Sequence, residues 1–100
     1  TTLFRSLLDN AIEACSASGN PDPEIRLSAN ISNGFLTVYM HNTKNPMQTF
    51  THKTTKSEPG AHGYGLSIIE DICQKYNGSY QWIDHNNTFD SIVLLQIKNL

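Results

Sequence analysis

Apolar residues recur every three or four positions near the start of the chain, which is the spacing of an amphipathic helix. The recurring positions are Leu3, Phe4, Leu7, Leu8, Ala11, Ile12 and Cys15. Residues 16–21, SASGNP, end this pattern with a glycine and a proline, as expected just past a helix C-terminus. The sequence therefore predicts a first helix with one apolar face.

The pattern then changes to strict alternation. Apolar residues at positions 25, 27, 29 and 31 predict a half-buried strand over residues 24–31, and those at 36, 38 and 40 predict the returning strand. The intervening Ser32-Asn33-Gly34 has the composition of a hairpin turn.

Residues 42–62 carry no periodicity, and a connection of that length in a compact domain is usually functional or disordered. Helical spacing returns over residues 66–77, where Asn77-Gly78 predicts a left-handed C-cap, and a last strand pair follows at 80–83 and 89–97. The order predicts a two-layer α+β domain. Its helices pack on one face of a mixed, mostly antiparallel sheet.

Composition and charge exclude some partners. The 100 residues contain no apolar run near the roughly 20 needed to cross a bilayer. A net charge of −2 argues against nucleic acid. The one basic region is the central loop, where Lys44, Lys53 and Lys56 stand against Glu58 alone, so that an anionic partner and plain solvation are both open.

The remaining chemistry-bearing side chains suggest packing. Cys15 and Cys73 fall on apolar helix faces, so two buried free thiols and a reducing compartment are expected. Tyr80 and Trp82 are expected to pack on the sheet. His41, His52 and His85 have no partner at catalytic or metal-ligand spacing.

The stretch GAHGYGLSII, residues 60–69, sets three glycines directly before the second predicted helix. It matches neither the dinucleotide pattern nor the P-loop, because no strand precedes it closely and no Lys-Ser or Lys-Thr follows. Gly63 and Gly65 instead add backbone N–H groups to the unpaired donors of the helix start, which suits an anion. Taken alone, such a cluster is more often an ordinary loop than a phosphate site.

On the first helix, Ser6, Asn10 and Glu13 form a stripe away from the apolar one. Asparagine is a mediocre helix former. Asn10 therefore either belongs to a solvated face or turns its carbonyl oxygen toward a hard cation such as Mg²⁺.

Together these elements resemble the GHKL ATPase superfamily. LLDNAIEAC, residues 7–15, resembles its N box, and HGYGLSII, residues 62–69, resembles its second glycine box. With a T-x-K pattern ahead of the glycines, the chain is similar to the sensor histidine kinases that include peptide-pheromone receptors. The resemblance implies one ATP-binding domain of the GHKL (Bergerat) fold over residues 1–100. It also implies that an N-terminal strand and upstream helices are missing and that a lid loop covers about residues 42–63.

The resemblance also implies roles for single residues. Asn10 would hold the Mg²⁺ that bridges the ATP phosphates, and Gly63 and Gly65 would donate backbone N–H groups to the phosphates. The other cofactor-binding candidates are Asn42 for the adenine amino group, Lys56 as a lid lysine, His62, Tyr64, and Leu66 in the pocket wall.

The chain departs from the family pattern in four places, one of which is Glu13, where many kinases carry a lysine and where the negative charge would repel phosphate unless a cation offsets it. Asn42 is an amide where the family has a carboxylate, which loses on the order of 1 kcal/mol of charge-assisted bonding. Thr43-Lys44-Asn45 contains no glycine, so the first glycine box is effectively absent. Ser6 occupies the catalytic position where hydrolysing members carry a general-base glutamate. A serine hydroxyl is a poor base at neutral pH, so efficient water activation is not expected.

The sequence thus predicts the catalytic domain of a sensor histidine kinase. It would present Mg-ATP to a histidine on a separate dimerisation domain of the parent protein, with a response regulator downstream. The isolated domain is expected to bind Mg-ATP weakly and not to phosphorylate itself. It is expected in the cytoplasm, with membrane anchoring of the parent left open. The alternatives are a nucleotide switch or docking module without kinase activity, and a serine/threonine kinase acting on an anti-sigma-type partner.

Overall fold

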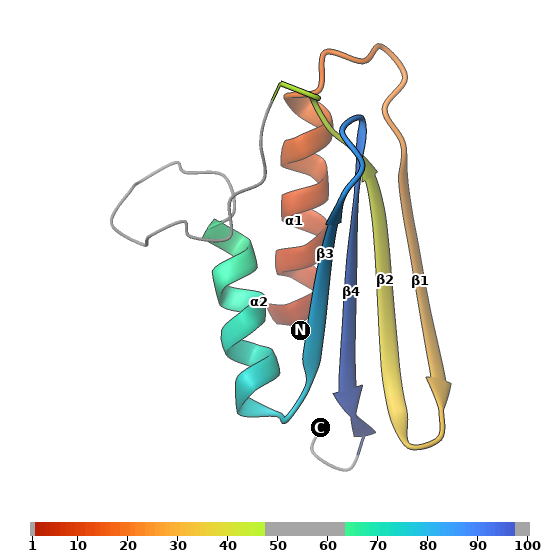
Figure 1. The fold of residues 1–100 in the computed structure, drawn as a ribbon, viewed down its shortest axis with the longest axis vertical. Helices are drawn as coiled ribbons and strands as arrows, with labels where there is room; N and C mark the ends of the chain where they lie inside the picture. The colour runs from red at the N-terminus through yellow and green to blue at the C-terminus, as the bar shows by residue number, and fades with distance from the viewer. Residues whose placement is uncertain (1, 48–63, 98–100) are drawn as a thin grey trace.

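The computed structural model describes residues 2–47 and 64–97. The elements follow in the order α1 (Thr2–Ser16), β1 (Ile25–Ser32), β2 (Phe35–Thr43), α2 (Tyr64–Lys75), β3 (Ser79–Asp84) and β4 (Thr88–Gln96). All the strands form one antiparallel sheet in the order β1-β2-β4-β3. Both helices lie on the same face of that sheet (Figure 1), so the predicted two-layer α+β architecture is confirmed. Neither helix has the length and apolar character that crossing a membrane requires.

The turns form where glycine and asparagine predict them. Asn33 and Gly34, between β1 and β2, both have positive φ, at 54° and 81°, which is the conformation of a type I′ hairpin. Asn77 ends α2 with φ at 55°. The following N–H of Gly78 donates to the Cys73 carbonyl at 2.6 Å, which completes a Schellman motif. The predicted C-cap is confirmed.

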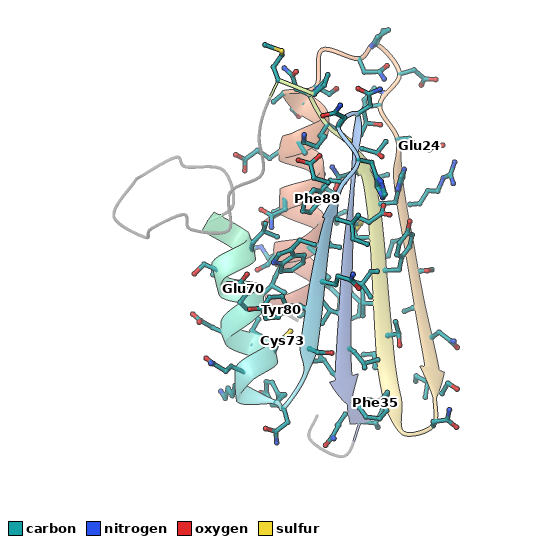
Figure 2. The ribbon with its side chains drawn as sticks, in the orientation of Figure 1. Glu24, Phe35, Glu70, Cys73, Tyr80 and Phe89 are labelled. Atoms are coloured by element: carbon teal, nitrogen blue, oxygen red, sulfur yellow. The ribbon has the colours of Figure 1, made fainter. Side chains whose placement is uncertain are left out.

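The core lies between the helices and the inner face of the sheet. Alternate residues of β4 are buried, and Val93 stands opposite Val38 of β2 at the centre. Cys15 and Cys73 are buried and free, as predicted. Glu70, Cys73 and Tyr80 lie between α2 and β3 (Figure 2). The Trp82 indole packs against the core and donates to Glu70 at 2.9 Å, and the partly exposed Tyr80 stacks on it.

The predicted half-burial of β1 is wrong. All eight of its residues are exposed, including Leu27 at 52% and Ile31 at 69%. The helix α1 packs mainly on β2 and touches β1 only slightly, and α2 packs mainly on β3, so the described helices leave most of β1 uncovered. The alternation correctly predicts a strand, but its burial depends on what lies above the strand.

Two element boundaries bear on the site. The strand β2 continues through Thr43, so Asn42 and Thr43 belong to the sheet and pair with Phe89 and Thr88 of β4. The helix α2 begins at Tyr64, two residues before the predicted start, which places Gly65 in its first turn.

We expect Gly78→Ala to lower the free energy of unfolding by about 2 kcal/mol or more. A Cβ at this position would lie 2.5 Å from the backbone oxygen of Leu94 and 2.5 Å from Leu95 Cδ2, and a backbone oxygen cannot move aside cheaply. Gly19→Ala is the matched control, because a Cβ there meets nothing within 4 Å and only the positive φ of 73° is strained, at about 1 kcal/mol. Urea denaturation measures both, and equal losses would contradict the steric explanation.

Candidate functional site

The amide of Asn10 is the unusual feature of α1. The residue lies near the middle of the helix and is half-buried. Its Nδ2 is the one buried side-chain nitrogen or oxygen without a hydrogen-bond partner within residues 2–47 and 64–97. An unsatisfied buried amide costs about 1–3 kcal/mol. Ser6, one turn earlier, is also buried, at 9% exposure. Ser6 and Asn10 therefore do not lie on a solvated face, whereas Glu13 of the same stripe is exposed.

The start of α2 lies beside the middle of α1 (Figure 1), and the two helices pack against each other. Gly65 is the second residue of α2, and the backbone N–H groups of a first helical turn have no partner within the helix. Leu66 is buried at the same end, at 8% exposure, and belongs to the core. The two helices therefore pack with the start of α2 level with the middle of α1.

The other candidates near the glycines cannot be placed. Lys56, His62 and Gly63 lie outside the described residues, as does the side chain of Tyr64. Their implied roles stay predictions.

Asn42 is buried, at 4% exposure, on β2. Its Nδ2 donates to the backbone carbonyl of Thr43 at 3.0 Å. Because a carbonyl only accepts, this bond fixes which end of the amide is nitrogen and leaves Oδ1 as an acceptor. An acceptor is what the amino group of adenine requires.

Contrary to what the sequence suggested, Lys44 is not an exposed lysine of the central loop. Its side chain is buried, and its Nζ contacts Asp84 Oδ1 at 3.1 Å and donates to the Asn86 carbonyl at 3.1 Å. Its backbone N–H donates to the Asn87 carbonyl at 2.9 Å. The lysine therefore joins the end of β2 to the β3–β4 hairpin and is not available to an anion.

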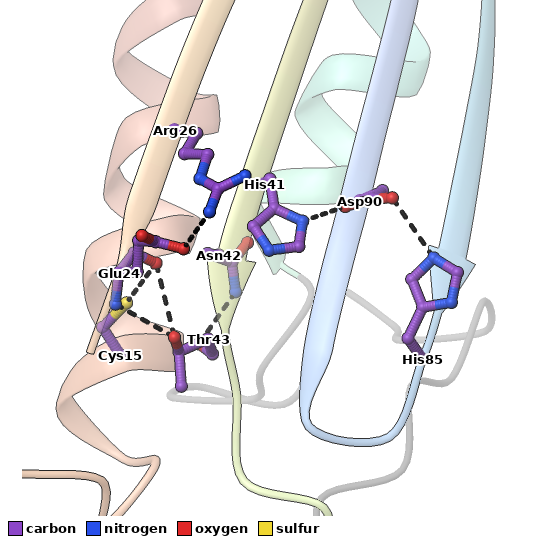
Figure 3. Close-up of polar contacts among 8 residues, drawn as sticks. All are labelled: Cys15, Glu24, Arg26, His41, Asn42, Thr43, His85 and Asp90. Carbon is purple, nitrogen blue, oxygen red and sulfur yellow. Dashed lines mark hydrogen bonds and ion pairs between the residues drawn. The ribbon is translucent and has the colours of Figure 1, made fainter. Parts of the chain in front are cut away.

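Neighbouring backbone groups hold the same strand end (Figure 3). The Thr43 N–H donates to the Glu24 carbonyl at 3.0 Å, and the Glu24 N–H donates to Thr43 Oγ1 at 3.0 Å. Asn45 Nδ2 donates to the Ala17 carbonyl, just past α1, at 3.3 Å. Residues 42–45 are thus fixed by α1, by the segment before β1 and by the β3–β4 hairpin.

The sequence profile of the GHKL domain family matches residues 1–99. This chain belongs to the GHKL family. No curated protein matches it.

Solved structures show the same fold for this GHKL domain. The nucleotide-free catalytic domain of histidine kinase ThkA superposes with a TM-score of 0.68 at 22% identity, over 94% of this chain and 64% of that one. The histidine kinase domain of the blue-light activated kinase EL346 from Erythrobacter litoralis gives 0.70 at 13% identity, over 97% and 42%. This chain therefore spans under two thirds of either structure. The expected histidine-kinase-type fold is confirmed, and the pheromone-receptor branch stays a prediction.

The outer face of this GHKL domain carries a cluster that sequence reasoning missed (Figure 3). His41 Nδ1 lies 2.5 Å from Asp90 Oδ1, and His85 Nε2 lies 3.2 Å from Asp90 Oδ2. His41 and Asp90 are direct partners in the β2–β4 register, 49 residues apart in sequence, so only the strand pairing reveals the contact. Within the described ranges, no three His, Cys, Asp or Glu residues are arranged to hold a metal.

The cluster favours the ionised form of Asp90. Burial alone would raise the pKa of this carboxyl, but hydrogen bonds from His41, Tyr39 and His85 lower it below its ordinary value of 3.8. Burial raises the pKa of Tyr39, and its hydrogen bond to Asp90 raises it further. The hydrogen bonds to Asp90 therefore stabilise the fold while its carboxyl is ionised.

We expect Asp90→Asn to weaken the domain at neutral pH and to flatten its acid unfolding profile. Because the folded-state pKa of Asp90 lies below the unfolded value, its contribution is complete above about pH 4 and is lost as the pH falls through the folded-state pKa. Urea unfolding at a series of pH values measures this. Asp22→Asn, at an exposed acid before β1, should keep the wild-type profile. An unchanged acid slope in the Asp90 variant would contradict the assignment.

Proposed function

We propose that this GHKL domain binds Mg-ATP between the middle of α1 and the start of α2. It presents the nucleotide for phosphoryl transfer to a histidine on a separate dimerisation domain of the parent protein. Family membership and the fold of histidine kinase catalytic domains support this proposal. The observation that carries it is the buried amide nitrogen of Asn10, which has no hydrogen-bond partner within the described part of the chain.

A magnesium ion fits the chemistry of this position. An asparagine amide supplies a neutral, hard oxygen ligand, which Mg²⁺ accepts beside phosphate oxygens and water. The unpartnered Nδ2 is a hydrogen-bond donor, which suits a phosphate oxygen beside the ion, while Oδ1 is the atom that would hold the metal. In the proposal Asn10 holds the ion, which supplies charge neutralisation on the phosphates when bound.

The N-terminus of α2 suits the phosphates. Its backbone N–H groups and the positive end of the helix dipole attract anions. The first turn contains no acidic residue that would oppose this attraction. In the proposal Gly63 and Gly65 donate N–H groups to the phosphates, Lys56 and His62 approach them from the lid, and Tyr64 completes the glycine box.

The remaining parts of the proposed site are the adenine contact, the pocket wall and the lid. The Asn42 acceptor contacts the amino group of adenine, and Leu66 forms part of the pocket wall. The proposed lid spans residues from about 42 to 63, and its moving part follows residues 42–45, which hydrogen bonds hold to the rest of the fold. Lid closure would exclude water from the phosphates.

Ser6 favours transfer over hydrolysis. Phosphoryl transfer depends mainly on positioning and charge neutralisation. A buried serine hydroxyl at the general-base position activates water poorly. An imidazole acceptor already carries its lone pair and needs little help from a base. In the proposal the parent is a sensor kinase with its catalytic domain in the cytoplasm, and it passes the phosphoryl group to a response regulator.

Asn10→Ala should change nucleotide affinity and stability in opposite directions. We expect Mg-ATP affinity to fall at least about tenfold, since a metal ligand is removed. The free energy of unfolding should hold or rise by up to about 1 kcal/mol, because an unsatisfied buried amide and a poor helix former disappear. Isothermal titration and urea denaturation measure the two quantities.

Asn42→Ala is the comparison variant, since its buried amide is hydrogen-bonded. It should lose about 1–3 kcal/mol of stability as well as adenine affinity. If Asn10→Ala destabilised the fold as much as Asn42→Ala and left Mg-ATP binding intact, the proposed role of Asn10 would be wrong.

In the parent protein, we expect Mg-ATP to label a histidine with an acid-labile phosphate, and we expect this chain alone to remain unlabelled. The nucleophile lies on the dimerisation domain in this proposal, so the catalytic domain has nothing to phosphorylate by itself. Radiolabelled ATP followed by acid and base treatment measures the product. An acid-stable phosphate would favour a serine/threonine kinase, and binding without any label would favour a nucleotide switch.

A further inference from the structure

We infer that Lys44 is a positioning residue for Asn42. Its side chain and backbone fix the peptide group whose carbonyl orients the Asn42 amide. The inference rests on the proposed function, because it concerns the residue assigned to adenine.

The Lys44 side chain carries a charge and is buried. Lysine is almost never fully buried unless it is paired. The Lys44 side chain is only 7% exposed, and its Nζ lies 3.1 Å and 3.4 Å from the two carboxylate oxygens of Asp84. The Asn86 carbonyl accepts a further bond from the ammonium at 3.1 Å. This geometry satisfies the ammonium and fixes the long side chain against the β3–β4 hairpin.

The peptide group between Thr43 and Lys44 is hydrogen-bonded on both sides. Its N–H belongs to Lys44 and donates to the Asn87 carbonyl at 2.9 Å. Its carbonyl belongs to Thr43 and accepts the Asn42 Nδ2 at 3.0 Å. Because a peptide group is planar, the hairpin bond on one side sets the direction of the carbonyl on the other. A rotation of this plane would release the Asn42 amide.

The segment after Asn42 differs from the family pattern. The positions where the first glycine box is expected read Thr43-Lys44-Asn45 and offer no glycine. A lysine at this position makes side-chain contacts that a glycine cannot make. Its ammonium pairs with the Asp84 carboxylate and donates to the Asn86 carbonyl. The result is a preorganised acceptor at Asn42, which lowers the entropic cost of binding a base. The loss of the glycine box is thereby offset at this end of the site.

The test uses Lys44→Met, which keeps most of the length of the side chain and removes its charge, and Asp84→Asn, which keeps the shape of its partner. Lys75→Met, at an exposed lysine in the last turn of α2, is the matched control. NMR first follows the Asn42 side-chain amide without ligand. We expect it to move and to exchange faster with water in both test variants but not in the control.

The second readout separates positioning from a merely structural role. Mg-ATP carries the adenine, whereas Mg-tripolyphosphate carries only the phosphate tail. We expect both test variants to lose about five- to tenfold in affinity for Mg-ATP and to bind Mg-tripolyphosphate as the wild type does. NMR titration measures both affinities in the wild type and in each variant.

Two results would overturn the inference. One is an unchanged Asn42 side-chain amide in Lys44→Met, and the other is an equal loss of affinity for both ligands. If Lys44→Met does not fold, Asp84→Asn decides, since the Asp84 side chain is 29% exposed and tolerates the amide. If the wild type binds no Mg-ATP, the proposed function fails, and the Asn42 amide in the ligand-free variants still decides the role of Lys44.

Discussion

The pairing of β2 with β4 is the constraint on which the other features depend. These strands form the centre of the sheet although they lie about fifty residues apart in the chain. Their register puts Val38 opposite Val93 in the core and His41 opposite Asp90 on the outer face. It also carries the β3–β4 hairpin to the end of β2, where Lys44 meets Asp84. Because side chains alternate between the two faces of a strand, a register shift of one residue would turn each side chain to the opposite face and break all of these contacts.

The buried polar groups of this domain fall into two classes. At the end of β2, the Asn42 amide nitrogen and the Lys44 ammonium each have partners, so their burial is compatible with a stable fold. On α1, the Asn10 amide nitrogen has none within the described ranges, and the fold bears that cost. Proteins commonly hold such unfavourable groups where a ligand completes them. In the proposal, this unpartnered donor marks Asn10 as the position that a ligand completes.

The altered first glycine box and the paired Lys44 have one physical explanation. A glycine-containing segment after β2 would leave the backbone free to take many conformations. This chain instead places a charged side chain there and holds it with Asp84, the Asn86 carbonyl and the Asn87 carbonyl. In the proposed site, the base is contacted by a rigid strand end and the phosphates by the start of α2. In the proposed site, the fixed strand end therefore takes the place of a flexible glycine segment.

The sequence by itself determined the local structure. Period-3.6 and period-2 spacing, Asn33-Gly34 and Asn77-Gly78 specify helices, strands, turn and cap through interactions between residues a few positions apart. The N-box and glycine-box stretches also indicated the family. Only the tertiary structure decided which faces are covered and which distant polar groups meet. It left β1 exposed, buried Lys44 against Asp84, and joined His41 and His85 through Asp90. Burial and long-range pairing depend on how layers pack and strands register, and no local pattern encodes either.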